Sequence, residues 1–451
     1  MGRTAQDVLE EIHRSDVQKV KVAVADVDGV LRGKYIHKDK FLSAAHAGFG
    51  FCNVVFGWDS ADACYDGAAY TGWHTGYPDA VARIDLATYR RVPWEDGLPF
   101  FLADFEDGAG APLAVCPRQL LKRVATRARD RGLHPRCGLE FEWFNFKETP
   151  QSLADKGHAR PQPMTPGMFG YSLLRVAQNR PFFSALMDEM AAFGVPLEGL
   201  HTETGPGVLE AAILNAEALE AADRGVLFKT GVKEIAQRFG LMPSFMAKWN
   251  KDLPGCSGHC HQSLWDGERN LFHDESAPHG MSRLFRSYVA GLLETLPDLL
   301  ALYAPTVNSY KRLVEGFWAP TKPTWGVDNR TVAFRVIPGG PKSTRVEVRV
   351  TGSDINPYLA VAASVAAGLW GIERGLDLKA PAVEGSAYDA PGDRLPVNLY
   401  EATRRLEGSK VARELLGDAF VDHFVCTRLW EWRQFEQSVT DWELKRYFEI
   451  I

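Results

Sequence analysis

The chain has 451 residues, of which 45% are hydrophobic and 24% charged, and its net charge is −6. This length is too great for one ordinary hydrophobic core and the composition is that of a soluble globular protein, so we expect two domains. The negative charge gives no reason to expect nucleic acid or an anionic membrane as a partner.

The start of the chain and its cysteines indicate a cytoplasmic protein. Residues 1–7 lead into a polar amphipathic helix and lack the apolar core of a signal peptide. No apolar run approaches the roughly 18 residues that span a membrane. The seven cysteines are scattered and form no CxxC pair, which favours a reducing compartment over a disulfide framework or a zinc ribbon.

Residues 1–115 are predicted to form a small domain built mainly of strands. A helix is expected over 5–13, and strands over 20–25 and 30–36, because Asp28-Gly29 between two apolar runs is a hairpin signal. Residues 48–91 are rich in Gly, Asp, Tyr and Trp and predict a long loop. Further short strands are expected near 82–84 and 100–103, with a linker over 108–112 and a domain boundary near Cys116.

The hairpin segment also resembles a motif of a different class. Asp26-Val27-Asp28-Gly29-Val30 is similar to the nucleophile motif of haloacid-dehalogenase-type phosphatases. In those enzymes the motif leads into a loop and a helix. Here residues 32–36 resume strand character at once, which favours the hairpin.

Residues 116–451 alternate strands with long helices in an irregular order. Helices are predicted over 118–131, 181–193, 216–239 and 281–303, in an Ala-rich buried segment ending near Arg374, and at the C-terminus. Residues 148–169 are expected to be a loop, and 242–248 and 258–264 to be strands. This order favours an antiparallel α+β domain over a parallel dinucleotide-binding sheet, and no glycine-rich phosphate loop stands in a strand-to-helix context.

Two stretches place ligand-type side chains at alternate positions. Within residues 138–144, Glu140 and Glu142 alternate with apolar residues, so both carboxylates face one side of a strand. Within residues 258–264, His259 and His261 have the same spacing. A single such pair is more often an exposed strand face or a pair of structural histidines.

A third stretch favours a functional role for these pairs over a structural one. In it, Arg345, Glu347 and Arg349 share one strand face and valines share the other. Three such strands predict one sheet whose concave face binds metal and phosphate. Carboxylates with one imidazole suit Mg²⁺ or Mn²⁺, whereas zinc recruits more Cys or His. Arginines suit phosphate, which they bind in a bidentate manner. Glu203 and Glu210 flank a Gly-Pro-Gly turn that would fold both carboxylates toward one point.

Together with further motifs, these stretches resemble the glutamine synthetase family across nearly the whole chain. The motifs, in chain order, are Asp28-Gly29-Val30-Leu31-Arg32-Gly33-Lys34, Glu140-Phe141-Glu142, Glu203-Thr204-Gly205-Pro206-Gly207 with Glu210, Gly258-His259-Cys260-His261, Asn308-Ser309-Tyr310-Lys311-Arg312-Leu313, Asn329-Arg330 with Arg335, Arg345-Val346-Glu347-Val348-Arg349, and Asn356-Pro357-Tyr358.

The resemblance implies an α+β fold with a small β-grasp N-terminal domain (1–115) and a large catalytic domain (116–451) whose antiparallel sheet is flanked by helices. It implies active sites between adjacent subunits of six-membered rings, in a hexamer or a dodecamer. It also implies the reaction, in which ATP phosphorylates the γ-carboxylate of glutamate and an amine displaces phosphate to form an amide. Metal ions and arginines suit this chemistry because they neutralise charge on phosphate oxygens.

The site residues that the resemblance implies fall into groups by role. The expected ligands of one Mg²⁺ or Mn²⁺ are Glu142, Glu203 and Glu210, and those of a second are Glu140, His259 and Glu347. The expected ATP phosphate contacts are His261, Arg335, Arg345 and Arg349, with Arg330 steadying phosphoryl transfer. The expected substrate contacts for glutamate are Glu142, Gly255 and Arg312.

Departures from the family pattern bear on the choice of substrate. Trp318 occupies the position of a glutamate that takes a proton from bound ammonium in the family. A tryptophan cannot accept that proton, and it offers an apolar face with cation–π capacity. We therefore expect a carbon-bearing amine, as in the γ-glutamyl–amine ligase branch. The alternative is that Trp318 only packs and a nearby acid accepts the proton.

Two more positions are informative. Pro254 stands where ammonium-using members have an asparagine that contacts the amino acid substrate, so glutamate is the expected acyl donor on weaker grounds. Asp59 aligns with an ammonium-site aspartate that the family supplies from the neighbouring subunit, and it is predicted to be catalytic. Aromatic amines, polyamines and ethanolamine-like amines remain open, as do a true glutamine synthetase and a non-catalytic binding homologue.

Overall fold

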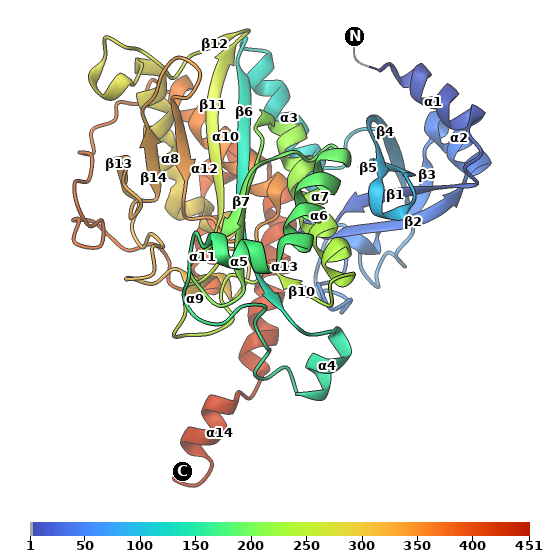
Figure 1. The fold of residues 1–451 in the computed structure, drawn as a ribbon. Helices are drawn as coiled ribbons and strands as arrows, with labels where there is room; N and C mark the ends of the chain where they lie inside the picture. Colours follow the sequence, from blue (N-terminus) through green and yellow to red (C-terminus); the bar gives the residue numbers. More distant parts are fainter. Residues whose placement is uncertain (1–2) are drawn as a thin grey trace.

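The computed structural model describes residues 3–451 and contains two β-sheets surrounded by helices (Figure 1). The first sheet has five strands in the order β2-β1-β5-β4-β3, and the second has ten strands along the path β13-β14-β15-β11-β6-β8-β7, with β9, β10 and β12 paired to its members. The smaller sheet is formed entirely by the N-terminal quarter of the chain. The α+β class predicted from the sequence is confirmed.

The N-terminal region begins with a helix and then forms the smaller sheet. Its elements are α1 (Ala5–Arg14), β1 (Lys19–Ala25), β2 (Leu31–His37), α2 (Lys38–Ala47), β3 (Phe49–Cys52), the 3-10 helix η1 (Asn53–Phe56), β4 (Asp79–Val92), η2 (Pro93–Glu95) and β5 (Leu98–Glu106). Strand β1 pairs antiparallel with β2 and parallel with β5. This mixed sheet has the β-grasp arrangement, and the β1–β2 hairpin confirms the interpretation of Asp28-Gly29 as a turn.

The prediction of a long loop over 48–91 is wrong at both ends. Residues 49–52 form β3, which pairs antiparallel with the start of β4, and β4 continues for 14 residues to Val92. The register of β4 against β5 shifts between Asp85 and Arg90. Few residues of β4 are buried, because charged side chains occupy much of it, so it lacks the alternation that marks a half-buried strand. Helix α2, with only Phe41 and Ala44 buried, had no predicted counterpart.

The larger sheet contains the strands that were predicted to bear the site. Its strands are β6 (His134–Phe146), β7 (Leu197–Thr202), β8 (Val208–Ile213), β9 (Ala216–Glu217), β10 (Met242–Ser244), β11 (Gly258–Asp266), β12 (Arg269–Asn270), β13 (Trp325–Val327), β14 (Phe334–Ile337) and β15 (Arg345–Val348). Strands β13 and β14 pair in parallel, and the other pairs are antiparallel. The predicted antiparallel sheet is therefore confirmed.

Helices cover the larger sheet and form the rest of the molecule. They are α3 (Pro117–Arg129), α4 (Pro150–Asp155), α5 (Leu173–Gln178), α6 (Arg180–Ala192), α7 (Ala218–Gln237), η3 (Pro278–Gly280), α8 (Arg283–Tyr303), α9 (Ser309–Arg312), α10 (Pro357–Glu373), α11 (Leu399–Gly408), α12 (Lys410–Leu416), α13 (Asp418–Gln437) and α14 (Asp441–Tyr447). The short helix α4 lies inside the segment predicted as a loop over 148–169. No helix of the described residues is long and apolar enough to cross a membrane.

The alternation of apolar and charged residues determines which face of the sheet is buried. Phe141 and Trp143 of β6 are fully buried and pack against Phe228 of α7, with ring centroids 6.0 and 5.5 Å apart. Val346 and Val348 of β15 are also fully buried. The opposite face of the same strands is therefore left to the charged side chains, as the sequence predicted.

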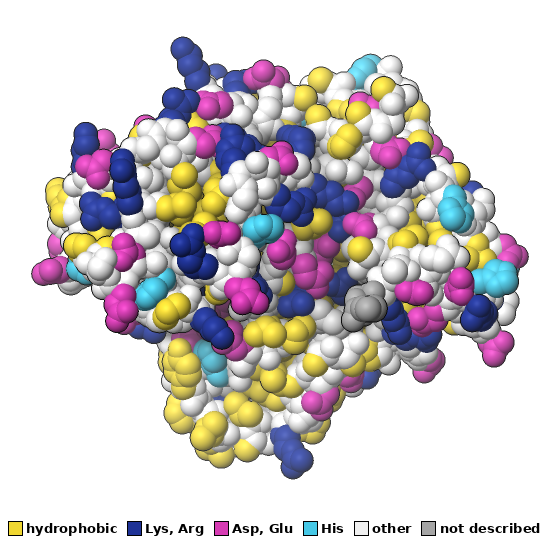
Figure 2. All heavy atoms as spheres, turned by 90° about the horizontal axis from the view of Figure 1, so that it is seen from above, with side chains coloured by type: hydrophobic (Ala, Val, Ile, Leu, Met, Phe, Trp, Pro, Cys, Tyr) yellow, Lys and Arg dark blue, Asp and Glu magenta, His cyan; other side chains and the backbone are white. Residues whose placement is uncertain are grey.

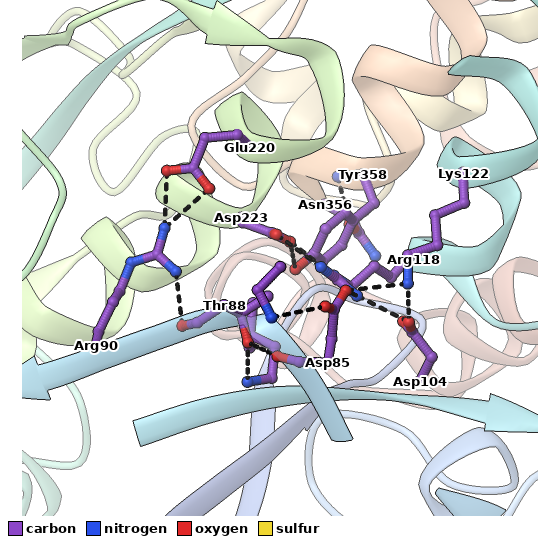
Figure 3. A network of polar contacts seen from close by, with 12 residues as sticks. Asp85, Thr88, Arg90, Asp104, Arg118, Lys122, Glu220, Asp223, Asn356 and Tyr358 are labelled. Carbon is purple, nitrogen blue, oxygen red and sulfur yellow. Dashed lines mark hydrogen bonds and ion pairs between the residues drawn. The ribbon is translucent and has the colours of Figure 1, made fainter. Parts of the chain in front are cut away.

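A buried ionic network joins the smaller sheet to the helices (Figure 3). The Arg118 guanidinium, on α3, donates from Nε to Asp223 of α7 at 2.8 Å and from NH1 to Asp104 of β5 at 2.8 Å and Asp85 of β4 at 3.0 Å. The Tyr358 hydroxyl, on α10, donates to Asp223 at 2.7 Å. Because the network lies where the two sheets meet through α3, we propose the domain boundary beside it, at residues 115–116.

The chain ends in a segment that extends away from the body of the molecule, which we call the C-terminal arm (residues 438–451; Figure 1). It contains α14, and its apolar side chains are exposed. They are Val439, Trp442, Leu444, Tyr447, Phe448, Ile450 and Ile451. Exposed apolar side chains gathered on one projecting segment are typical of an interaction surface.

Candidate active site

A cavity of about 700 Å³ lies over the charged face of the larger sheet. Of the residues that the sequence predicted for the site, all except Asp59 line this cavity: Glu140, Glu142, Glu203, Glu210, Gly255, His259, His261, Arg312, Trp318, Arg330, Arg335, Arg345, Glu347 and Arg349. Figure 2 shows that acidic and basic side chains are also interspersed on the outer face seen from above.

Strand register places the predicted ligands directly opposite one another. Glu140 of β6 pairs with His259 of β11, and His261 pairs with Glu347 of β15. On the other side of β6, Glu142 pairs with Glu210 of β8. Opposed residues of antiparallel strands bring their side chains to within reach of a shared ion, so the sheet itself gathers segments that are far apart in the sequence.

The first cluster of ligands is centred on His259. Its Nδ1 lies 3.1 Å from Oε1 of Glu140 and 3.2 Å from Oε1 of Glu347. His261 Nε2 lies 3.8 Å from Oε2 of Glu140. Glu140, His261 and Glu347 offer ligand atoms that all lie within 4.8 Å of one another. The predicted proximity of His259 and Glu347 is therefore present, and His261, assigned by resemblance to phosphate, also lies among the ligands.

The charge states in this cluster follow from burial and from neighbouring charges. Burial, together with the Arg349 charge, lowers the pKa of His259, so its ring is neutral near pH 7, which is the form that binds metal. Burial opposes ionisation of Glu347, but the charge of His259, which is protonated in the acid range where Glu347 titrates, and that of Arg349 lower the pKa of Glu347 to about 2. Hydrogen bonds from His259 and His261 likewise outweigh burial and lower the pKa of Glu140.

The second cluster consists of His201, Glu203 and Glu210, whose ligand atoms also lie within 4.8 Å of one another. His201 Nε2 lies 3.3 Å from Glu210 Oε1, and its Nδ1 lies 3.8 Å from Glu203 Oε2. The Gly205–Gly207 turn between β7 and β8 brings the two carboxylates together, as predicted. A side chain is excluded at Gly207 because its Cβ would lie 2.5 Å from the Asn145 carbonyl oxygen, and φ there is +70°.

His201 was not predicted as a site residue, although a signal for it is present in the sequence. His201 and Glu203 have the same alternate spacing as His259 and His261. The ring of Tyr171 stacks on His201 with centroids 4.4 Å apart. Glu142, predicted as the third ligand of this set, instead accepts the Ser257 amide N–H at 2.5 Å. It stays a predicted ligand, with His201 as an additional one.

The donor chemistry of both clusters fits divalent cations. An ion with bonds of ~2.1 Å separates opposite ligands by ~4.2 Å, and the donor atoms of each cluster all lie within 4.8 Å of one another. Burial raises the pKa of Glu210 to about 8, with the charges of Glu140 and Glu142 adding to the effect. Carboxylates crowded in this way are stabilised by a cation between them. Mixed carboxylate and imidazole donors suit Mg²⁺ or Mn²⁺.

Arginines border the first cluster. Arg335 NH1 donates to Glu347 at 3.0 Å and Arg349 NH1 donates to the other oxygen of Glu347 at 2.5 Å. Arg345 Nε donates to His261 Nδ1 at 3.1 Å, and Arg330 is exposed at the cavity wall. The guanidinium groups therefore lie beside the carboxylates, where they are able to contact phosphate oxygens.

A second cavity of about 450 Å³ adjoins the first. The two cavities share Glu140, His261 and Arg345. Arg136, Trp265 and Lys342 line the outer part of the second cavity. A ligand that is too large for one cavity would extend from the aromatic and basic side chains of the second cavity to the ligand clusters in the first.

On the opposite side, Arg312 and Gly255 form a compact corner of the main cavity. Arg312 is 4% exposed, and its guanidinium donates to the carbonyl oxygens of Val350 and Arg349 at 3.0 and 3.1 Å. A Cβ at Gly255 would lie 2.4 Å from the Ala247 carbonyl oxygen and 2.9 Å from Arg312 Cγ. Only glycine therefore fits at position 255. The Arg312 guanidinium, held in place by its two hydrogen bonds, has one edge facing the cavity.

Aromatic residues form the mouth of the cavity on residues 313–320, which we call the mouth loop. Phe317 and Trp318 both line the cavity. Trp318 is 62% exposed and has φ of +62°. A bulky residue with positive φ is strained by about 1–3 kcal/mol and is found mainly at functional sites. Trp318 is thus available for contact with a ligand, and it is not a buried packing residue within its own chain.

Asp59 is the one predicted site residue that does not line the cavity. Trp430 Nε1 donates to its Oδ2 at 2.8 Å, and the amides of Ala61 and Ala63 donate to its Oδ1 at 2.8 and 3.0 Å. The prediction assigned Asp59 to the site of a neighbouring subunit, so its catalytic role stays a prediction.

A family model, curated relatives and solved structures all relate this chain to the same family. The model of the glutamine synthetase catalytic domain matches residues 114–447. Type-1 glutamine synthetase 2 of Dictyostelium discoideum is 55% identical over 98% of this chain and 86% of its own length. Gamma-glutamylethanolamide synthetase of Streptomyces coelicolor is 39% identical over 99% of this chain and 97% of its own length. A solved GmaS–ADP complex superimposes with a TM-score of 0.86 at 29% identity, over 98% of this chain and 99% of the other.

Proposed function

Because this chain belongs to the glutamine synthetase family and is a ligase of that family, we propose that it joins the γ-carboxylate of glutamate to a carbon-bearing amine. Ligases of the family use ATP and divalent metal ions such as Mg²⁺ or Mn²⁺. The proposed reaction proceeds through γ-glutamyl phosphate, which the amine then attacks.

The observation that supports the choice of a carbon-bearing amine is Trp318 at the cavity mouth. Its exposed indole, next to Phe317, offers an apolar surface and a cation–π face where an ammonium-using site needs a proton acceptor. Relatives at 39% and 55% identity bear names that refer to different products, γ-glutamylethanolamide and glutamine. Family membership alone therefore does not select the amine.

In the proposed site, different groups of side chains bind the metal ions and the phosphates of ATP. Glu140, His259 and Glu347 would hold one divalent ion, and Glu203 and Glu210, with Glu142 and His201, the other. Bound divalent ions would neutralise phosphate oxygens and so favour phosphoryl transfer. Arg330, Arg335, Arg345 and Arg349 would orient the phosphates of ATP, and the smaller cavity would accommodate the rest of the nucleotide.

The acyl donor and the amine would occupy the remaining surface. The Arg312 guanidinium would bind a carboxylate of glutamate beside Gly255, and the mouth loop would shield the acyl phosphate from water. The amine would enter past Trp318, and Asp59 from an adjacent subunit would contribute to its site. The exposed apolar side chains of the C-terminal arm support association of several copies, in line with our proposal of a six-membered ring, single or stacked.

The direct test is turnover with a panel of amines. The protein is incubated with ATP, Mg²⁺, glutamate and one of ammonium, methylamine, ethanolamine, putrescine or benzylamine, and phosphate release is followed. We expect at least one carbon-bearing amine to exceed ammonium in kcat/KM, with the matching γ-glutamyl amide identified by mass. Best turnover with ammonium would show a true glutamine synthetase instead, which the 55% identical relative favours.

A non-catalytic binding homologue is the alternative from a different class. Such a protein would be expected to have lost metal ligands, and Glu140, Glu203, Glu210, His259 and Glu347 are all present at the cavity. Absence of phosphate release with every acceptor, in protein that binds ATP, would support that alternative.

Trp318→Ala tests the aromatic mouth directly. Loss of the indole is expected to lower kcat/KM for the preferred amine about tenfold, because a desolvated cation–π or apolar contact contributes ~1–2 kcal/mol. The KM for ATP should not change, since the arginines and ligands are untouched. Trp73→Ala, at an exposed tryptophan outside the cavity, is the matched control. Equal kcat/KM values for the two variants would remove Trp318 from the amine site.

A further inference from the structure

Lys248 lies behind the aromatic mouth of the cavity, in the segment that follows β10. The residue is 4% exposed, and within residues 3–451 its ammonium has no hydrogen-bond partner. A buried ammonium without hydrogen bonds is costly, so this position needs a compensating contact. That contact is with Phe317, whose ring centroid lies 3.9 Å from Lys248 Nζ.

The backbone of Lys248 is held firmly. The Lys248 N–H donates to Asn308 Oδ1 at 2.8 Å, and Asn308 Nδ2 donates to the Lys248 carbonyl oxygen at 2.8 Å. Ala247, the residue before Lys248, is held as well, because the Cys256 N–H donates to its carbonyl oxygen at 2.8 Å. Lys248 is thus fixed between the Gly255 segment and the segment that leads into Arg312.

The mouth loop, in contrast, contains no helix or strand of its own. Trp318 within it is exposed and has a strained backbone, so its conformation depends on support from neighbouring residues. Phe317 is the adjacent residue, and the fixed Lys248 side chain lies against its ring. Cation–π contacts are strongest where the cation is removed from water, as it is here.

We infer that Lys248 is a positioning residue for amine selection, because its contact with the Phe317 ring holds the mouth loop so that Trp318 faces the cavity. This inference rests on the proposed function, since it concerns the site that we assign to the amine. Lys248 itself does not line the cavity, so it would act through the loop and would not touch the substrate.

The test compares Lys248→Met, which keeps the length of the side chain without its charge, with Lys248→Arg, which keeps the charge. Lys248→Met is expected to raise the KM for the preferred amine about tenfold and to reduce the preference for that amine over ammonium, with the KM for ATP unchanged. Lys248→Arg should restore the amine KM to within about threefold of the wild-type value. Lys251→Met, in the same segment with an exposed side chain, should behave as wild type.

A double-mutant cycle separates this role from a merely structural one. If the two side chains act through one contact, Lys248→Met combined with Phe317→Leu should raise the amine KM no more than Lys248→Met alone. Additive effects would overturn the inference. Should Lys248→Met fail to fold, Lys248→Gln, which also removes the charge, is expected to raise the amine KM, and an unchanged KM would again overturn it.

Different results would overturn the proposed function and the role of Lys248. A wild-type enzyme that prefers ammonium overturns the proposed function. A wild-type enzyme that prefers a carbon-bearing amine, with the same amine KM in Lys248→Met, overturns only the role of Lys248.

Discussion

Replacing Glu347 with alanine is expected to abolish ATP-dependent phosphate release while the protein remains folded. Glu347 is 1% exposed, lies 3.2 Å from His259 Nδ1, and is contacted by Arg335 and Arg349. Its removal would leave a divalent ion without a central ligand and the two guanidinium groups without their shared partner. We expect kcat to fall by about 10³-fold or more, the scale reached when a major electrostatic group is lost.

The loss should be traceable to metal binding. Mn²⁺ is expected to raise the melting temperature of the wild-type protein, because a ligand that binds the folded state stabilises it by mass action. In Glu347→Ala this rise should be smaller, because only the cluster of Glu203 and Glu210 would still bind an ion. Glu347→Gln, which keeps the shape of the side chain, should be nearly as inactive, whereas Glu268→Ala, at an exposed glutamate in the β11–β12 turn, should be active. Phosphate release within twofold of wild type would exclude Glu347 from the metal site.

The second large effect concerns stability. Arg118→Met is expected to lower the free energy of unfolding by about 3–5 kcal/mol, because removal of one partner leaves buried charges uncompensated. Asp104 and Asp223 are 3% and 2% exposed and both accept hydrogen bonds from Arg118. Tyr358 and Lys122 would remain as partners, but neither replaces the guanidinium between the two sheets.

Urea unfolding followed by tryptophan fluorescence would measure this effect. Arg129→Met, at an exposed arginine of the same helix whose side chain donates to Thr126, is the matched control and should change stability by less than about 0.5 kcal/mol. If both variants unfold at the same urea concentration, the network contributes nothing to holding the smaller sheet in place.

The charged face of the larger sheet was predictable because its strands alternate strictly. Glu140 and Glu347 have buried apolar neighbours on both sides in the sequence, and His259 and His261 flank the buried Cys260, so period-2 patterning identified the strands and their functional face together. The pairing of these strands was not derivable from spacing alone. Resemblance to a known family supplied the grouping of Glu140, His259 and Glu347, and the structure supplies the pairing of their strands.

Other features were not predictable from local patterns. Only residues 82–84 of strand β4 were predicted, because arginines and aspartates occupy many of its positions where a half-buried strand shows apolar residues. His201 had a visible spacing signal, but its approach to Glu210 depends on the β7–β8 pairing, where the register shifts near Gly199. Lys248 has no local signature at all, because its partner ring is distant in the sequence.

The separation between rigid strands and the mouth loop has a consequence for evolution. A one-residue insertion in β6 or β11 would turn the predicted ligands of that strand to the opposite face of the sheet, since strand side chains alternate between faces. Substitutions in the loop carry no such penalty. Under the proposed function, a lineage could therefore change the amine that it uses by substituting a few aromatic positions at the rim, while the metal and phosphate residues on the strands stay the same.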